Sequence, residues 1–204
     1  MMGPNRRHLI VMAKAPRLGR VKTRLARDVG AVAAWNFYRR NLEAVTRGLA
    51  ADPRWQTYLG VSPDESANDP ALWPADLPML PQGTGDLGAR MAGLLDAMPP
   101  GPAVLIGADI PGVRPAHIWA AFWALGNADA VFGPADDGGY WLVGLKRRPV
   151  PAGLFQGVRW SSADALTDTL ANLPAHWRHA RAATLSDVDD GAAFSRLGTL
   201  AGTR

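Results

Sequence analysis

Apolar stretches of β-strand character alternate with helical patterns along most of this 204-residue chain. Predicted strands and helices take turns, with strands at 8–13, 56–61 and 103–108 and helices at 31–49, 86–98 and 114–125. This alternation predicts an α/β fold, because helices that link successive strands cover the two faces of a common sheet. We expect a three-layer αβα sandwich with a mainly parallel, Rossmann-like sheet, formed by a single domain over residues 1–204.

The remaining segments continue this pattern. Residues 129–132 and 140–143 are predicted to be two strands joined by a short acidic loop. We further expect a helix that Ser161 or Ser162 caps and that runs to Asn172, a strand near 178–185 and a helix near 191–200. Residues 64–81, rich in Pro, Asp and Ala, are expected to form a long loop. Ligands of such sheets bind beyond the carboxyl ends of the strands, so the loops that follow strands are the expected functional segments.

Composition narrows the classes of protein to which the chain can belong. The sequence contains no cysteine, which excludes a disulfide scaffold, thiol catalysis and a zinc site built on thiolates. Its first apolar run, Leu9–Ala13, is too short for a membrane span or a signal-peptide core, so we expect a cytoplasmic protein. The net charge of +4 is a mild excess without a dense basic stripe, which favours small anionic ligands over nucleic acid.

Cations are concentrated in the loop that follows the first predicted strand. Residues 14–25 hold Lys14, Arg17, Arg20, Lys22 and Arg24, together with Gly19 and Thr23. A cationic loop at the carboxyl end of a strand suits a phosphate chain, although a solvated basic loop has the same composition. It is not a Walker A loop, because it lacks the second glycine beside the lysine.

A glycine-rich loop precedes the second predicted helix. The glycines of Gly83-Thr84-Gly85-Asp86-Leu87-Gly88 match the dinucleotide fingerprint, which raises the rival hypothesis of a nicotinamide-dependent oxidoreductase. That hypothesis is disfavoured because Pro78 and Pro81 make the preceding stretch a poor central strand. We expect Asp86 and Arg90 to contact a nucleotide, with Asp86 as a helix N-cap the simpler alternative.

Two further acidic positions are candidates for a metal site. Asp109 follows a predicted buried strand directly and is expected to face the ligand crevice. Magnesium is usually held by one or two carboxylates together with substrate phosphates and water, so a second carboxylate is needed, and the run Asp187–Asp190 can supply it. A turn aspartate and an N-cap cluster are the respective alternatives.

The most distinctive stretch is Gly133-Pro134-Ala135-Asp136-Asp137-Gly138-Gly139-Tyr140-Trp141. Its two carboxylates can take protons or bind metals, and its double glycine lets backbone approach a ligand closely. An Asp-Gly hairpin turn is the structural alternative, and the two interpretations are compatible.

Taken in order, these motifs resemble a bacterial family of GT-A-fold transferases, the glycosyltransferase A or selenodomain-associated transferases. The matching segments span nearly the whole chain: residues 13–25, 82–91, 107–111, 133–144, 154–161 and 185–189. The resemblance implies the fold of nucleotide-diphospho-sugar transferases, a superfamily of glycosyltransferases and of nucleotidyltransferases such as 2-phospholactate guanylyltransferase. One departure is that the usual Asp-x-Asp metal motif reads Gly107-Ala108-Asp109, with a single carboxylate.

The resemblance implies transfer of a sugar from a nucleotide-diphospho-sugar to an acceptor hydroxyl, assisted by Mg²⁺ or Mn²⁺. Asp137 would orient or deprotonate the acceptor, with Asp136 the less favoured base. The other expected roles are phosphate binding by Lys14, Gly19, Lys22, Thr23 and Arg24; nucleoside contact by Gln82, Gly85, Asp86 and Arg90; metal binding by Asp109 and Asp189; and acceptor contact by Gly138, Gly139, Tyr140, Trp160 and Ser161. Two alternatives are nucleotidyl transfer from a nucleoside triphosphate with release of pyrophosphate, and a nucleotide-sugar-binding protein without catalysis.

Overall fold

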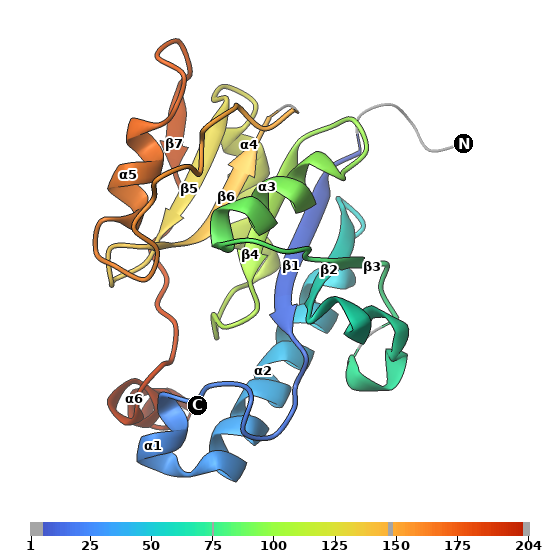
Figure 1. Ribbon diagram of the computed structural model, residues 1–204, viewed down its shortest axis with the longest axis vertical. Helices are drawn as coiled ribbons and strands as arrows, with labels where there is room; N and C mark the ends of the chain where they lie inside the picture. The colour runs from blue at the N-terminus through green and yellow to red at the C-terminus, as the bar shows by residue number, and fades with distance from the viewer. Residues whose placement is uncertain (1–5, 75, 147–148, 202–204) are drawn as a thin grey trace.

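The computed structural model describes residues 6–74, 76–146 and 149–201, and a seven-stranded sheet runs through its centre (Figure 1). The strand order is β3-β2-β1-β4-β6-β5-β7, and every pairing is parallel except the two made by β6. The strands are β1 His8–Lys14, β2 Gln56–Ser62, β3 Met79–Pro81, β4 Ala103–Gly107, β5 Ala130–Pro134, β6 Tyr140–Leu145 and β7 His179–Arg181. The predicted α/β fold with a mainly parallel sheet is confirmed.

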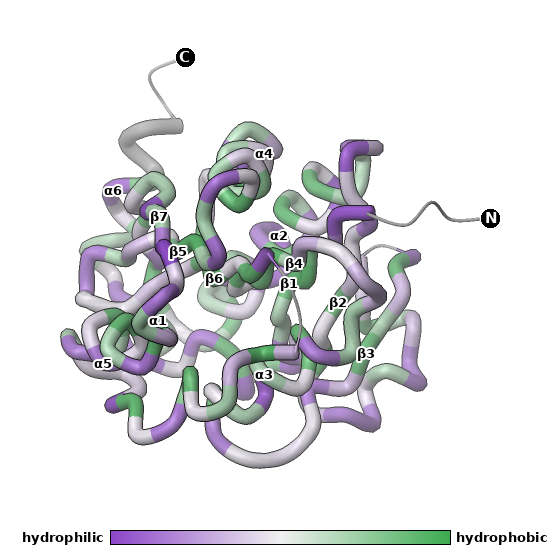
Figure 2. The backbone as a smooth tube through the Cα atoms, turned by 90° about the horizontal axis from the view of Figure 1, so that it is seen from above, coloured by the Kyte–Doolittle hydropathy of each residue, from purple (hydrophilic) through white to green (hydrophobic). Residues whose placement is uncertain are grey.

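Helices cover both faces of this sheet. They are α1 Leu25–Val29, α2 Ala31–Ala50, α3 Leu87–Asp96, α4 Pro115–Ala124, α5 Ala165–Ala171 and α6 Gly191–Ala201, with 3₁₀ turns η1 Asp64–Asn68 and η2 Pro70–Leu72. Seen from above, α2 and α4 lie on one side of the strands and α3 and α5 on the other (Figure 2). In the part of the chain that the structure describes, no helix has both the length and the apolar character needed to cross a membrane.

The layered arrangement follows from the alternation of side chains along each strand. In β1, Leu9 and Val11 enter the core formed with α2 and α4, whereas Ile10 enters the core formed with α3. All three side chains are fully buried, because a central strand of a covered parallel sheet is apolar on both faces. The continuous apolar run in the sequence is therefore explained by its position in the middle of the sheet.

Three elements differ from the prediction. The segment 64–81, expected to be a loop, contains two 3₁₀ turns and the edge strand β3, where the missing N–H of Pro81 costs no ladder hydrogen bond. The short helix α1 was not expected; it is stabilised by tertiary packing, since Leu25 is buried against Ala34 and Val188. The cap at Ser161 or Ser162 was wrong, because the helix begins only at Ala165, after the N-cap position Asp164.

The acidic double-glycine stretch forms the turn of the β5–β6 hairpin. Because β6 is the one antiparallel strand among those described, this turn lies at the same edge of the sheet as the carboxyl ends of β1, β2 and β4. Gly138 has φ +86°, and a Cβ there would lie 2.2 Å from the carbonyl oxygen of Ala163. The turn is thereby pressed against the segment that precedes α5, and the amide of Leu166 donates to the Gly138 carbonyl.

We predict that Gly138→Ala destabilises the protein by about 2–4 kcal/mol, because the variant adds a backbone clash to the cost of a left-handed alanine. Gly112→Ala is the matched control: Gly112 has φ +88° with nothing within 4 Å of its Cβ position. That control should lose only about 1 kcal/mol. Urea unfolding of both variants measures the difference, and equal losses would show that the contact with Ala163 is unimportant.

Candidate functional site

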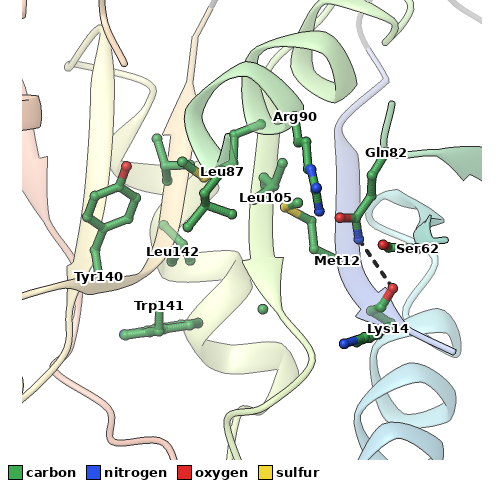
Figure 3. A pocket seen from close by; sticks show the side chains of 14 residues that line it. Met12, Lys14, Ser62, Gln82, Leu87, Arg90, Leu105, Tyr140, Trp141 and Leu142 are labelled. Atoms are coloured by element: carbon green, nitrogen blue, oxygen red, sulfur yellow. Dashed lines mark hydrogen bonds between the residues drawn. The ribbon is translucent and has the colours of Figure 1, made fainter. Parts of the chain in front are cut away.

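The carboxyl ends of the central strands, the first residues of β6 and the start of α3 enclose a first cavity of about 500 Å³ (Figure 3). Parallel register sets Lys14 of β1 level with Ser62 of β2 and Met12 level with Gly107 of β4, so the ends of three strands meet at one edge. Lys14 and Arg90 contribute the cationic side chains of the lining, and no carboxylate is among its described lining residues. This cavity is therefore suited to an anionic ligand.

Gln82 is held in a fixed orientation at the wall of this first cavity. Its amide nitrogen donates to the carbonyls of Ala13 and Gly60, at 3.2 and 2.9 Å, so that its carbonyl oxygen is left to accept a hydrogen bond. Arg90 donates from Nε to the carbonyl of Gly85 at 3.1 Å. These contacts tie the glycine loop to the wall of the cavity.

A second cavity of about 410 Å³ adjoins the first. The two share Leu87, Met91, Tyr140 and Trp141, so they are neighbours across a common apolar wall. The second is lined by four carboxylates, those of Asp109, Asp137, Asp187 and Asp189, and by Arg24, Trp160, Ser161 and Ser162. The site thus has one basic and one acidic compartment.

A buried ammonium joins two of these carboxylates. Nζ of Lys22 lies 2.7 Å from Oδ1 of Asp189 and 3.6 Å from Oδ2 of Asp109, and the lysine side chain is only 4% exposed. Arg24 makes a longer contact of 3.5 Å with Asp189 from an exposed position. Lys22, expected to bind phosphate, is therefore engaged by the two aspartates that were expected to bind metal.

The carboxyl groups of the second cavity repel one another. Burial and the neighbouring charge of Asp189 raise the pKa of Asp187 to about 6, against the opposing effect of Lys22. Burial also raises the pKa of Asp109, which Lys22 partly offsets. A site that keeps carboxylates in such an environment stores unfavourable electrostatic energy, as functional sites often do.

The two carboxylates of the hairpin turn face different ways. Asp137 lines the second cavity, and its Oδ1 accepts a hydrogen bond of 2.9 Å from the amide of Gly139. Asp136 accepts a hydrogen bond from the hydroxyl of Ser186 and is not among the lining residues of either cavity. Of the two candidate bases, Asp137 is the one that can reach a ligand in the second cavity.

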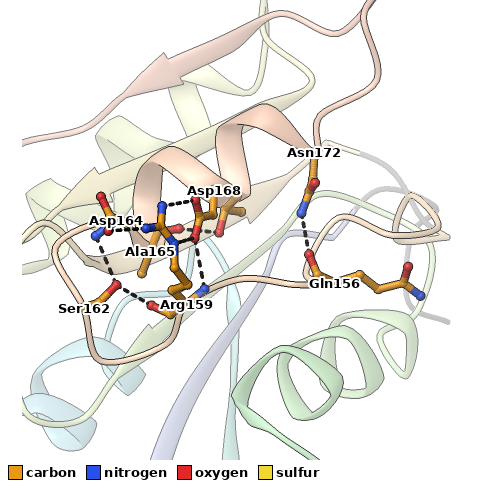
Figure 4. A network of polar contacts seen from close by, with 8 residues as sticks. Gln156, Arg159, Ser162, Asp164, Ala165, Asp168 and Asn172 are labelled. Atoms are coloured by element: carbon orange, nitrogen blue, oxygen red, sulfur yellow. Dashed lines mark hydrogen bonds and ion pairs between the residues drawn. The ribbon is translucent and has the colours of Figure 1, made fainter.

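An ion-pair network fixes the loop that carries Trp160 and Ser161 (Figure 4). Arg159 contacts Asp164 at 2.7 Å and Asp168 at 2.8 Å, and the hydrogen bonds that Arg159 donates to Asp168 lower the pKa of Asp168 to about 2. Ser161 has φ +59°, an uncommon conformation for a residue other than glycine. The network holds this strained turn in the lining of the second cavity, and such strain is typical of ligand sites.

Several predicted residues have other positions. Gly19 and Thr23 line neither cavity, and Asp86 accepts a hydrogen bond from the amide of Ala89 as the N-cap of α3. At Gly88 the loop after β6 packs closely against α3, since a Cβ at this position would lie only 2.8 Å from the indole of Trp160. These contacts explain the glycine motif by helix capping and packing, and β3 before it is a short edge strand.

Asp187 is the lining carboxylate that the sequence reasoning did not single out. It lies in the acidic run from which Asp189 was selected as the metal ligand, and Asp190 of the same run caps α6 by accepting from the amide of Ala193. Alternate residues of an extended segment point to the same side, which is the signal that pairs Asp187 with Asp189.

The carboxylates of Asp109 and Asp189 are suitable ligands for a divalent cation, but they are too few to hold one by themselves. Oδ1 of Asp109 is buried and makes no hydrogen bond with any described residue, and carboxylate oxygens are the donors that Mg²⁺ and Mn²⁺ prefer. Within the described residues, no group of three acidic or histidine side chains is arranged to hold a metal unaided. A cation there would need further oxygens from a bound phosphate or from water.

Comparison with known families and structures identifies relatives of the chain. The model of the DUF2064 family, described as an uncharacterized protein conserved in bacteria, matches residues 45–162. No curated protein matches the chain in sequence. A structure from Desulfovibrio desulfuricans G20, named for the nucleotide-diphospho-sugar transferases, shares 28% identity at a TM-score of 0.85, covering 95% of this chain and 86% of that one.

Two more distant structures share the fold. The 4-diphosphocytidyl-2C-methyl-D-erythritol synthase of Anaerococcus prevotii DSM 20548 aligns at a TM-score of 0.62 and 10% identity, covering 98% of this chain and 100% of that one. Glucosyl-3-phosphoglycerate synthase of Mycobacterium tuberculosis, in complex with Mn²⁺, UDP and glucosyl-3-phosphoglycerate, aligns at 0.51 and 12% identity, covering 97% and 76%. The expected nucleotide-diphospho-sugar transferase fold is confirmed.

The raised pKa of Asp187 predicts how stability depends on pH. An unfolded aspartate has a pKa near 3.9, so between about pH 4 and pH 6 the folded protein binds a proton that the unfolded chain has released, and stability falls as pH rises. We expect Asp187→Asn to stabilise the protein by about 1–2 kcal/mol at pH 7, a value kept small because partial exposure screens the repulsion. At pH 4.5 the gain should be little, because Asp187 of the folded protein is then protonated and uncharged.

Thermal unfolding in EDTA, across this pH range, measures the effect without a bound cation. Asp190→Asn is the control, because asparagine caps a helix as well as aspartate does. A gain for Asp187→Asn that does not change with pH would contradict the electrostatic origin.

Proposed function

The chain belongs to the DUF2064 family, and we propose that it is a metal-assisted glycosyltransferase that moves a sugar from a nucleotide-diphospho-sugar to an acceptor hydroxyl. The observation that carries this proposal is the pair of adjoining cavities, one basic and one acidic, at the carboxyl edge of the sheet. A group-transfer enzyme needs two ligands side by side, and the shared wall of Leu87, Met91, Tyr140 and Trp141 is where the transferred group would lie.

The donor would occupy the first cavity. Lys14 and Arg90 would attract its diphosphate, while the fixed carbonyl oxygen of Gln82 would accept a hydrogen bond from the nucleoside. Both cations also offset the charge that develops on the leaving diphosphate. The D. desulfuricans relative, named for enzymes with this class of donor, supports the assignment.

Asp109 and Asp189 would hold Mg²⁺ or Mn²⁺ together with phosphate oxygens of the donor. When bound, the cation supplies Lewis-acid stabilisation of the leaving diphosphate. Lys22, which now lies between these carboxylates, supplies positive charge at the same place. The Mn²⁺ in the distant glucosyl-3-phosphoglycerate synthase agrees with this choice of metal.

The acceptor would lie in the second cavity, with its hydroxyl at Asp137. The acceptor oxygen forms a bond to the anomeric carbon while the bond from that carbon to the diphosphate oxygen breaks. The bonding pair leaves with the nucleoside diphosphate, and the hydroxyl proton passes to the Asp137 carboxylate. Gly139 donates to Asp137 and thereby keeps this carboxylate oriented.

Nucleotidyl transfer from a nucleoside triphosphate is less well supported. There an acceptor phosphate attacks a nucleoside triphosphate, and that phosphate would have to enter a cavity lined by four carboxylates. Like charges at this range are unfavourable, which favours an acceptor without a phosphate at the reacting end.

The proposal is tested by incubating the purified protein with Mn²⁺ and a panel of nucleotide sugars or nucleoside triphosphates. We expect release of nucleoside diphosphate from a sugar donor. Release of pyrophosphate from a triphosphate would instead establish nucleotidyl transfer. Tight nucleotide-sugar binding without turnover over a broad acceptor panel would indicate a binding protein.

The metal assignment predicts that Asp109→Asn weakens the Mn²⁺-dependent part of nucleoside diphosphate affinity by roughly 10- to 100-fold. Titration calorimetry with UDP and GDP, with and without Mn²⁺, measures this. Asp190→Asn serves as the control, because Asp190 caps α6 and lines neither cavity. Unchanged Mn²⁺ dependence in Asp109→Asn would remove this residue from the metal site.

The base assignment predicts that Asp137→Asn lowers kcat by about 10²- to 10⁴-fold and changes the KM for the donor little, because only proton transfer from the acceptor is lost. Steady-state kinetics with the active donor measure this. Asp136→Asn discriminates between the two aspartates, and a larger loss in that variant would transfer the role to Asp136.

A further inference from the structure

The acidic compartment contains a carboxylate for which the proposed reaction has no use. Asp187 lines the second cavity and makes no hydrogen bond or ion pair with any described residue. Of the other three carboxylates there, Asp109 and Asp189 share the ammonium of Lys22, and Asp137 accepts from Gly139. Asp187 is thus a partly buried carboxylate without a hydrogen bond or ion pair among the described residues.

The cavity provides little positive charge of its own for this carboxylate. Arg24 is the one cationic side chain in its described lining, and that side chain is 71% exposed and directed at Asp189. A divalent cation bound together with the donor would not change the net charge of the cavity, because the two negative charges of the donor diphosphate offset the two positive charges of the cation. With the donor in place, Asp137 and Asp187 still give the acceptor's compartment a negative potential.

Aromatic rings also line the same cavity. Tyr140 and Trp160 lie 6.3 Å apart between ring centroids at 67°, and Trp141 continues the wall toward the first cavity. Aromatic faces attract cations. Carboxylates and aromatic rings in one cavity are a combination that recognises a positively charged group.

We propose that the acceptor of this transferase carries a protonated amine, which pairs with Asp187 beside the aromatic wall of Tyr140 and Trp160. This inference rests on the proposed function and specifies the class of its second substrate. An ammonium gains charge-assisted hydrogen bonds and relieves repulsion among the carboxylates. A neutral acceptor leaves Asp187 without a counter-charge, and an anionic acceptor adds to the repulsion.

The experiment compares three acceptor probes of similar shape and different charge: glucosamine, glucose and glucuronate. Ligand-observed NMR titrations, in saturating UDP and Mn²⁺ at pH 7, where the Asp187 carboxylate is ionised, measure their dissociation constants. We expect glucosamine to bind at least about 10-fold more tightly than glucuronate, with glucose between them. Equal affinities, undetectable binding of all three, or tightest binding of glucose or glucuronate would overturn the inference.

Substitution of the carboxylate assigns the effect to a residue. In Asp187→Asn the advantage of glucosamine over glucose should fall to less than about twofold, with glucose affinity unchanged. Asp190→Asn, from the same acidic run but outside the cavity, should keep the advantage. An advantage that survives in Asp187→Asn would also overturn the inference.

Failure of this inference differs from failure of the proposed function. If the protein releases nucleoside diphosphate from a sugar donor and yet favours neutral or anionic probes, only the acceptor class is wrong. If no nucleotide sugar binds or turns over, the proposed function itself is wrong.

Discussion

The buried ammonium of Lys22 connects the three segments from which the site is built. It reaches from the loop after β1 to Asp109 after β4 and to Asp189 near the end of the chain. The backbone of Lys22 is left-handed, with φ +47°, and this conformation costs about 1 kcal/mol for a residue other than glycine. The contacts of Leu25 with Val188 hold two of these segments together on the apolar side, where α1 and α6 lie together in Figure 1.

The two cavities of the site differ in charge, since the charged residues described in the lining of the first are cations and those of the second are mainly carboxylates. In the proposed reaction the basic side of the shared wall would hold the donor diphosphate and the acidic side the acceptor, and both sides draw on residues at one edge of the sheet. Carboxylates confined together raise each other's pKa and weaken the fold, as they do at Asp187. Such a cost is commonly retained where binding or catalysis depends on it.

Local sequence patterns were sufficient to predict the layers of the fold, but they were insufficient to predict two of its short elements. The apolar runs of β1, β2 and β4 and the periodic helices α2, α3 and α4 are long enough for their pattern to predict type and approximate ends. The three-residue strand β3 and the five-residue helix α1 have no such pattern. Each exists because a neighbour provides hydrogen bonds or apolar contacts, and neither is visible in a short window of sequence.

The same division applies to the site. The sequence by itself determined which loops would meet, because parallel strands direct their carboxyl ends to one edge; Lys14, Asp109 and the hairpin turn with Asp137 could be placed there in advance. Only the tertiary structure decided how the charges pair. It set Lys22 between Asp109 and Asp189, turned Asp136 toward Ser186 and left Asp187 without a partner. Strand direction follows from local pattern, whereas the partner of a charge depends on distances between segments far apart in the chain, which no local pattern encodes.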